Sequence, residues 1–182
     1  IEAVKNGIQV LLGSLRQDPH ALETAYLSVI TFDTEARQVV PLTDLVSFQE
    51  PTLNAQGVTS LGDGLKLLSN CIDNEVAKST PEQKGDWKPL VFIMTDGAPT
   101  DDWQSGLNEF RKRKTGIVVA CAAGAGADTS VLRQITESVV ALDTTDSGTI
   151  KAFFKWVSSS VTASSKKVDN TGVEASSLNE LP

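Results

Sequence analysis

The order of hydrophobic and polar residues predicts two kinds of segment that alternate along the chain. Apolar residues spaced three and four positions apart, a pattern typical of amphipathic helices, occupy residues 1–15, 61–77, 103–114, 128–135 and 150–161. Apolar runs and alternating patterns that are typical of strands occupy residues 25–32, 36–42, 89–95, 116–123 and 139–142. The pattern therefore predicts a fold in which strands alternate with helices.

This order of segments predicts an α/β fold. Residues 25–32 and 36–42 flank the tight turn Asp33–Thr34–Glu35, so we expect them to form an antiparallel hairpin. The later strands are separated by helices, and such crossovers give a parallel sheet. We expect a doubly wound, mainly parallel sheet with the hairpin at one edge, over residues 1–163. A polar tail over residues 164–182, in which no periodicity survives, is expected to follow.

The composition narrows the classes of function. The chain has 182 residues, a formal net charge of −7 and a pI near 4.7, which describe one soluble, mildly acidic domain. Binding to nucleic-acid phosphates needs clustered Lys and Arg, so the charge argues against that partner. No apolar run approaches the ~20 residues that cross a bilayer. Cys71 and Cys121 lie in apolar segments and are expected to be free thiols in the cytoplasm.

Two loops carry the candidate chemistry, and both are expected at the carboxyl ends of the strands, where such sheets bind ligands. One is the Gly-rich loop QGVTSLGDGL of residues 56–65, and the other is IMTDGAPTDDW of residues 93–103. Thr59 offers a neutral hydroxyl and Asp96 a carboxylate, and oxygens of both kinds suit a hard divalent cation. Because hydroxyl ligands are neutral, they leave much of the cation's positive charge unneutralised. An open coordination position would therefore attract a carboxylate from a partner.

These motifs resemble a known family. The signature TDG (residues 95–97), the upstream G-x-T loop (residues 57–59) and the order of strands and helices look like a von Willebrand factor A domain. MTDGAPTDDW (residues 94–103) and FFKWVSSSV (residues 153–161) resemble the TerY type, which bacterial tellurium-resistance operons encode. The resemblance runs from residue 1 to about residue 165. It implies a non-enzymatic module that binds proteins through a metal-ion-dependent adhesion site.

The family's site consists of a D-x-S-x-S loop, a threonine and an aspartate. By position, Thr59 and Asp96 look like the threonine and the aspartate, and Gly57, Thr100 and Asp101 would lie at the rim where the partner binds. The resemblance implies Mg²⁺, or Mn²⁺ or Ca²⁺, as the cation. It also implies a partner that offers an acidic side chain, encoded in the same operon, and a role in tellurite resistance and stress responses.

The sequence departs from the family pattern at one point. It contains no D-x-S-x-S loop, and no segment matches the central first strand that precedes this loop in the family. Adjacent strands lie about 4.8 Å apart, so omission of a middle strand would leave a gap of about 9.6 Å lined by unpaired backbone groups. We therefore expect that strand in the natural protein, and a metal-free or distorted site in these 182 residues alone.

Two alternatives from other functional classes remain open. A Mg²⁺-dependent phosphohydrolase of the haloacid dehalogenase type also places an aspartate at the end of a buried strand. Its D-x-D-G pattern, however, would need an aspartate where Met94 stands. The second alternative is a metal-independent scaffold that binds its partner through the hairpin or the tail.

Other notable residues are expected to have structural roles. Asp18–Pro19–His20 is predicted to end the first helix, and Asp101 to cap the helix over residues 103–114. Trp103 is expected to pack that helix rather than to anchor a partner. Gly124–Ala–Gly126 is not expected to bind a dinucleotide, because Thr129 stands where that motif needs a third small residue.

Overall fold

The fold is that of a computed structural model, in which residues 2–54, 57–124, 126–142 and 147–166 are described. The chain divides into two compact units. Unit 1 comprises residues 1–28, 42–54 and 143–182, and unit 2 comprises residues 29–41 and 55–142. Within the described residues, no helix is both long enough and apolar enough to cross a membrane.

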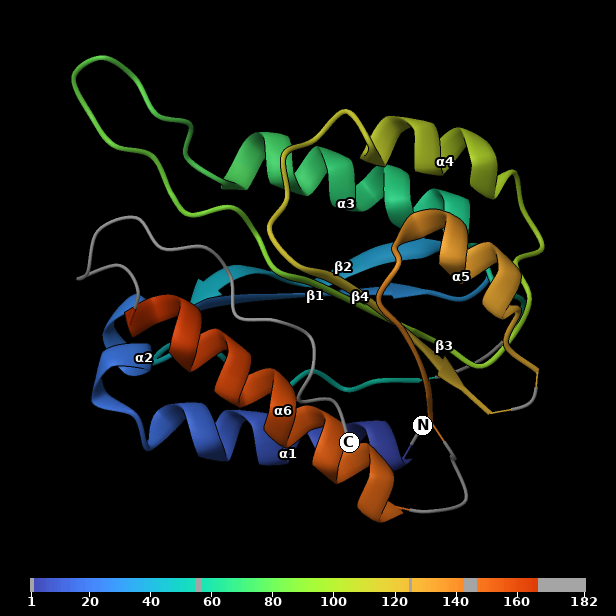
Figure 1. The fold of residues 1–182 in the computed structure, drawn as a ribbon, viewed down its shortest axis with the longest axis horizontal. Coiled ribbons are helices and arrows are strands. Elements are labelled where there is room, and N and C mark those ends of the chain that lie inside the picture. Colours follow the sequence, from blue (N-terminus) through green and yellow to red (C-terminus); the bar gives the residue numbers. More distant parts are fainter. Residues whose placement is uncertain (1, 55–56, 125, 143–146, 167–182) are drawn as a thin grey trace. The chain divides into compact units, whose positions relative to one another are not determined.

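Unit 1 is built around two long helices. Helices α1 (Glu2–Arg16) and α6 (Ser147–Lys166) lie side by side (Figure 1). The apolar stripe that the sequence predicts on each helix is buried, with Leu12, Leu15, Ile150, Phe153 and Val157 at 5% exposure or less. A Cβ atom at position 7 would collide with the ring of Phe154, so Gly7 allows the two helices to approach this closely.

A short helix follows α1 and was not predicted. The sequence indicates only a break at Asp18, but helix α2 (Pro19–Thr24) begins immediately after it. Asp18 Oδ1 accepts hydrogen bonds from the backbone N–H groups of His20 (3.0 Å) and Ala21 (3.3 Å), and the proline occupies the first turn. Aspartate followed by proline is a helix-start signal as well as a break, and six residues are too few to show a helical period.

The strands form two sheets among the described residues. Strands β1 (Tyr26–Phe32) and β2 (Ala36–Asp44) form the predicted antiparallel hairpin as a two-stranded sheet. Strands β3 (Val91–Thr95), β4 (Val118–Ala123) and β5 (Val139–Leu142) form a parallel sheet in the order β3-β4-β5. The predicted combination of a parallel sheet and an antiparallel hairpin is therefore confirmed.

Three helices accompany these strands in unit 2. They are α3 (Leu61–Glu75), α4 (Trp103–Phe110) and α5 (Thr129–Ile135), of which α3 and α4 lie side by side (Figure 1). The core that joins helices and parallel sheet consists of Leu61, Leu65, Ile72, Val91, Ile93, Leu107, Phe110, Ala120, Ala122, Val131 and Leu132. Trp103 packs against this core, as predicted. Because the parallel strands are packed in this core, the positions of their ends are fixed, and so are the starting points of the loops that follow them.

The helix boundaries correct two details. The residue that caps α4 is Asp102, whose Oδ1 accepts from the backbone N–H of Ser105 (3.2 Å), so the assignment of this cap to Asp101 is wrong. Helix α6 reaches Lys166, three residues into the segment predicted as tail, and residues 167–182 lie outside the described residues. Asp128 caps α5 as expected from the sequence.

Candidate functional site

The two loops that carry the candidate chemistry meet at one edge of unit 2. The carbonyl oxygen of Thr59 accepts hydrogen bonds from the backbone N–H (2.9 Å) and the hydroxyl (3.3 Å) of Thr100. A Cβ atom at position 97 would lie 2.9 Å from Thr59 Oγ1, so the threonine hydroxyl faces the residue that directly follows Asp96. The structure thus brings Thr59 into contact with Thr100 and next to Gly97, the residue that follows Asp96.

Asp96 projects from the end of a buried strand. The preceding residue, Thr95, is buried in β3, whereas Asp96 is exposed. A Cβ atom at position 126 would lie 2.6 Å from the carbonyl oxygen of Asp96, so the loop after β4 packs against this backbone. Among the described residues, no group forms a hydrogen bond or an ion pair with the Asp96 carboxylate. The backbone is therefore held in place while the side chain stays available to a ligand.

The turn of the hairpin supports the loop that carries Thr59. Ser60 donates from its backbone N–H to the carbonyl oxygen of Asp33 (3.0 Å) and from its hydroxyl to that of Thr34 (3.2 Å). Gly57 has a φ of +87°, and a Cβ atom there would collide with the hydroxyl of Thr34. Only glycine adopts this conformation at little cost in such a close approach. The rule that ligands bind at the carboxyl ends of parallel strands points to the loop after Phe32 as well as to the loop before Leu61, but the sequence does not predict this particular contact.

Asp101 differs from the other rim residues because both of its carboxylate oxygens are engaged. Oδ1 accepts from the backbone N–H of Gly62 (3.0 Å) and Oδ2 from that of Asp63 (2.9 Å), and both residues lie in the first turn of α3. Asp101 therefore satisfies the N-terminus of α3, 38 and 39 residues earlier in the chain, instead of that of α4. No sequence signal could reveal this role, because it depends on the packing of α3 against α4.

Thr59 and Asp96 provide oxygen ligands of the type that a hard cation prefers, but they are only two residues. Thr59 and Asp96 supply one hydroxyl and one carboxylate, and Mg²⁺ commonly takes only one or two carboxylates and completes its shell with water. Within the described part of the chain, no group of three or more His, Cys, Asp or Glu side chains is placed to hold a metal ion. These two residues therefore fit part of a magnesium site, and further oxygen ligands would have to come from water or from a partner.

The cysteines do not provide an activated nucleophile. Both are free thiols, as predicted. Burial raises the pKa of Cys121 to about 12. Burial and the neighbouring Glu75 carboxylate raise the pKa of Cys71. Because the thiolate is the reactive form, neither residue is prepared for covalent catalysis.

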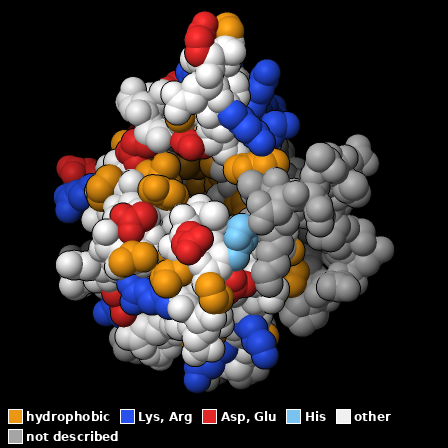
Figure 2. Space-filling model, turned by 90° about the vertical axis from the view of Figure 1, so that its left-hand side faces the viewer, with side chains coloured by type: hydrophobic (Ala, Val, Ile, Leu, Met, Phe, Trp, Pro, Cys, Tyr) orange, Lys and Arg blue, Asp and Glu red, His pale blue; other side chains and the backbone are white. Residues whose placement is uncertain are grey.

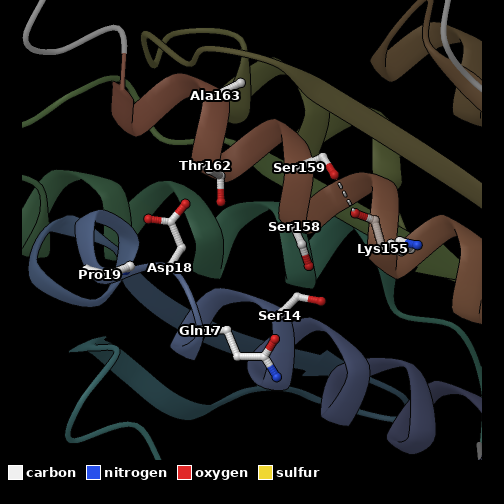
Figure 3. Close-up of a pocket in the computed structure, with 9 residues that line it drawn as sticks. All are labelled: Ser14, Gln17, Asp18, Pro19, Lys155, Ser158, Ser159, Thr162 and Ala163. Carbon is white, nitrogen blue, oxygen red and sulfur yellow. Dashed lines mark hydrogen bonds between the residues drawn. The ribbon is translucent and has the colours of Figure 1, made fainter.

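Unit 1 has an open pocket of about 580 Å³ that contains none of the predicted site residues. Figure 3 shows its lining by α1, the start of α2 and α6. Three of its polar side chains are used within the protein: Asp18 caps α2, and the hydroxyls of Ser158 and Ser159 donate to the carbonyl oxygens of Phe154 and Lys155. Because the two loops with the candidate chemistry lie elsewhere, the loop edge of unit 2 is the better candidate.

Comparisons with solved structures give the same fold. A von Willebrand factor type A protein from Catenulispora acidiphila has a TM-score of 0.66 at 18% identity, over 88% of this chain and 38% of its own. Proximal thread matrix protein 1 from the mussel byssus has a TM-score of 0.62 at 16% identity, over 89% and 43%. The PilB minor pilin from Streptococcus sanguinis has a TM-score of 0.58 at 12% identity, over 94% and 56%.

The likeness to these structures concerns the fold, because the identities are low and this chain spans between 38% and 56% of their lengths. No curated protein matches the sequence. The model of the von Willebrand factor type A domain matches residues 1–156. The chain therefore belongs to the von Willebrand factor type A domain family, whose members commonly serve as protein-interaction modules.

Proposed function

We propose that this domain is a non-enzymatic module that binds a partner protein through a divalent cation held by Thr59 and Asp96. The observation that supports the proposal is the contact between the two loops that carry these residues, at one edge of unit 2. The Thr59 hydroxyl faces the residue after Asp96, and neither side-chain oxygen has a partner among the described residues. A carboxylate and a hydroxyl on two adjoining loops offer oxygens of the kinds that a hard divalent cation prefers.

The two ligands would have different tasks. Asp96 supplies the negative charge that retains the cation, and Thr59 adds a neutral oxygen that leaves most of the positive charge uncompensated. The bound ion supplies a positive charge able to take an acidic side chain of the partner. Gly57 and Thr100 are exposed on the same two loops and would surround that side chain. Asp101 would shape the rim indirectly, because its own oxygens hold the start of α3.

The cellular role belongs to the same proposal. The stretches MTDGAPTDDW and FFKWVSSSV support a protein of the TerY type, acting in the cytoplasm in tellurite resistance and stress responses. The partner would then be encoded in the same operon. The phosphohydrolase alternative finds no support, since Met94 occupies the position of its first aspartate.

Titration of the ¹⁵N-labelled natural protein, in which we expect the upstream first strand and its D-x-S-x-S loop, with Mn²⁺ tests the proposal, because this paramagnetic ion broadens the amide signals near which it binds. We expect selective broadening of residues 57–60 and 96–101 that excess Mg²⁺ reverses. Asp96→Ala should abolish it, and Thr59→Val, which removes only the hydroxyl, should weaken it. Glu82→Gln, on a distant exposed loop, is the control and should change nothing.

Two results would contradict the proposal. Broadening that survives Asp96→Ala unchanged would remove Asp96 from the site. Capture of a cellular partner that is indifferent to EDTA and to Thr59→Val would favour the metal-independent scaffold.

A further inference from the structure

A basic surface lies at the end of unit 2 where strand β3 begins, away from the candidate site. It consists of residues 76–90, the loop between α3 and β3, and residues 111–116, which follow α4. The backbone N–H of Gly116 donates to the carbonyl oxygen of Pro89 (2.9 Å), so the two segments are in contact. Strand β3 has five residues and spans about 17 Å, which separates this surface from Asp96.

The charge of this surface is opposite to that of the chain. Its two segments contain seven Lys or Arg and two Asp or Glu, a formal charge of +5, whereas the whole chain carries −7. The remaining residues therefore carry −12. Such a local reversal produces a positive field on an otherwise acidic molecule.

Several of these cations have no internal counter-ion. Two carboxylates just outside the surface neutralise others. Arg113 and Lys78 pair with Asp73, at 2.6 and 3.6 Å. Lys112 and Arg113 pair with Glu109, at 2.6 and 3.1 Å. In contrast, Lys84, Lys88 and Lys114 are exposed, and no described carboxylate lies within 4.0 Å of their ammonium groups. Charges that the fold does not neutralise are available to an external partner.

An exposed tryptophan lies among these lysines. Trp87 is 57% exposed, and the ammonium of Lys84 lies 5.1 Å from the centre of its ring. The loop extends away from the rest of unit 2 (Figure 1), and Lys and Arg side chains gather beside it near the top of the face in Figure 2. Exposed tryptophans are frequent energetic centres of protein interfaces, because their large rings bury much area with few rotatable bonds.

Hydrogen bonds hold this loop in a defined shape. Ala77 and Asp86 exchange two of them, from the backbone N–H of Asp86 to the carbonyl of Ala77 (2.9 Å) and from that of Ala77 to Asp86 Oδ2 (2.7 Å). The N–H of Gly85 donates to Ser79 Oγ (3.0 Å). Trp87 is thus presented on an ordered loop, which lowers the entropy cost of binding.

We propose that the basic surface docks an acidic segment of a partner protein. Carboxylates of the segment would lie against Lys84, Lys88 and Lys114, and one apolar side chain would cover the ring of Trp87. A nucleic acid is disfavoured, because the charge of −12 on the rest of the chain repels a long polyanion while a short segment contacts only the surface. This contact needs no cation, so it is independent of the site at Asp96.

Fluorescence anisotropy of the whole chain with a labelled peptide of eight glutamates and two leucines tests the proposal, at 50 mM salt with EDTA present. We expect binding that Lys84→Glu with Lys88→Glu weakens at least tenfold and that Trp87→Ala weakens about tenfold. The charge-matched control Lys151→Glu, on α6, should change the affinity less than twofold, and Asp96→Ala should not change it. Circular dichroism verifies that each variant is folded.

Four results would overturn the proposal. An equal loss of peptide affinity in Lys151→Glu would show that the peptide responds only to the net charge of the protein. Peptide binding that appears only when Mg²⁺ replaces EDTA, and that Asp96→Ala abolishes, would place the peptide at the cation site and leave the proposed function intact. Tighter binding of a 12-nucleotide single strand, abolished by the double variant, would assign the surface to nucleic acid. Dimerisation in sedimentation that the double variant abolishes would make a second copy the occupant.

Discussion

Replacement of Asp101 by alanine should release the N-terminus of α3. The carboxylate accepts from two N–H groups, of Gly62 at 3.0 Å and Asp63 at 2.9 Å, that have no partner within the helix. Loss of a side chain that caps a helix costs typically about 1 kcal/mol, and hydrogen bonds to a charged group contribute somewhat more than neutral ones. We therefore expect Asp101→Ala to destabilise unit 2 by about 1–2 kcal/mol.

Amide hydrogen exchange measures this loss of stability at individual residues of α3. A loss of 1–2 kcal/mol corresponds to opening about 5–30 times more frequent, so the amides of Gly64 and Leu65 should exchange faster by about that factor. The melting temperature should fall by about 2–8 °C. Asp101→Asn keeps one acceptor and should lose about half as much.

Asp102→Ala removes the same negative charge at the neighbouring residue, so it distinguishes the loss of the α3 cap from an effect of the charge alone. Asp102→Ala removes the single cap of α4, so it should speed exchange in the first turn of α4 and leave α3 unchanged. Unaltered exchange of the first turn of α3 in Asp101→Ala would refute the assignment.

Two further predictions concern packing and pH. Gly106→Ala should lower the free energy of unfolding, measured by urea denaturation, by about 1–3 kcal/mol, because its Cβ would lie 2.7 Å from Gly62 Cα, although alanine favours helices. In the control Gly13→Ala the new Cβ meets nothing within 4 Å, so this variant should raise the free energy of unfolding by up to about 1 kcal/mol. Equal effects of the two substitutions would contradict the close packing of Gly106 against Gly62. The hydrogen bonds and charge of Arg113 lower the pKa of Asp73 below its ordinary 3.8, so this carboxylate stabilises the fold fully above that value and loses its contribution as pH falls through the lower folded-state pKa. Asp73→Asn should therefore destabilise at pH 7 and progressively less below pH 4, whereas a pH-independent difference would exclude the ion pair as the cause.

Much of the local structure was readable from the sequence because its determinants lie within a few residues. The spacing of apolar residues predicts α1, α3 and α6, since each must bury one face. Asp128 caps α5 through the N–H groups of Ser130 (2.9 Å) and Val131 (3.3 Å), a contact between neighbours in the chain. Helix α2 was missed because it completes fewer than two turns.

The candidate site was predictable only in part. Both loops follow from the rule that ligands bind at the carboxyl ends of parallel strands, so Thr59 and Asp96 could be placed on one edge. The sequence did not reveal that the Asp101 carboxylate accepts hydrogen bonds from the N-terminus of α3. It also did not reveal the contacts of Gly57 and Ser60 with the hairpin turn. Those contacts join residues more than 20 positions apart, and their geometry depends on side-chain packing between elements.

The sequence by itself determined the alternation of strands and helices, the family and the two loops that carry free oxygens, because periodicity, capping and strand-end motifs act over short distances. Only the tertiary structure decided which carboxylates stay free and which are used. The packing of α3 on α4 assigns Asp101 to a helix terminus, whereas Asp96, at the end of the buried strand β3, is exposed to solvent. It also decided that Trp103 is part of the core whereas Trp87 is exposed among lysines, since burial is settled by the surroundings and not by the residue type.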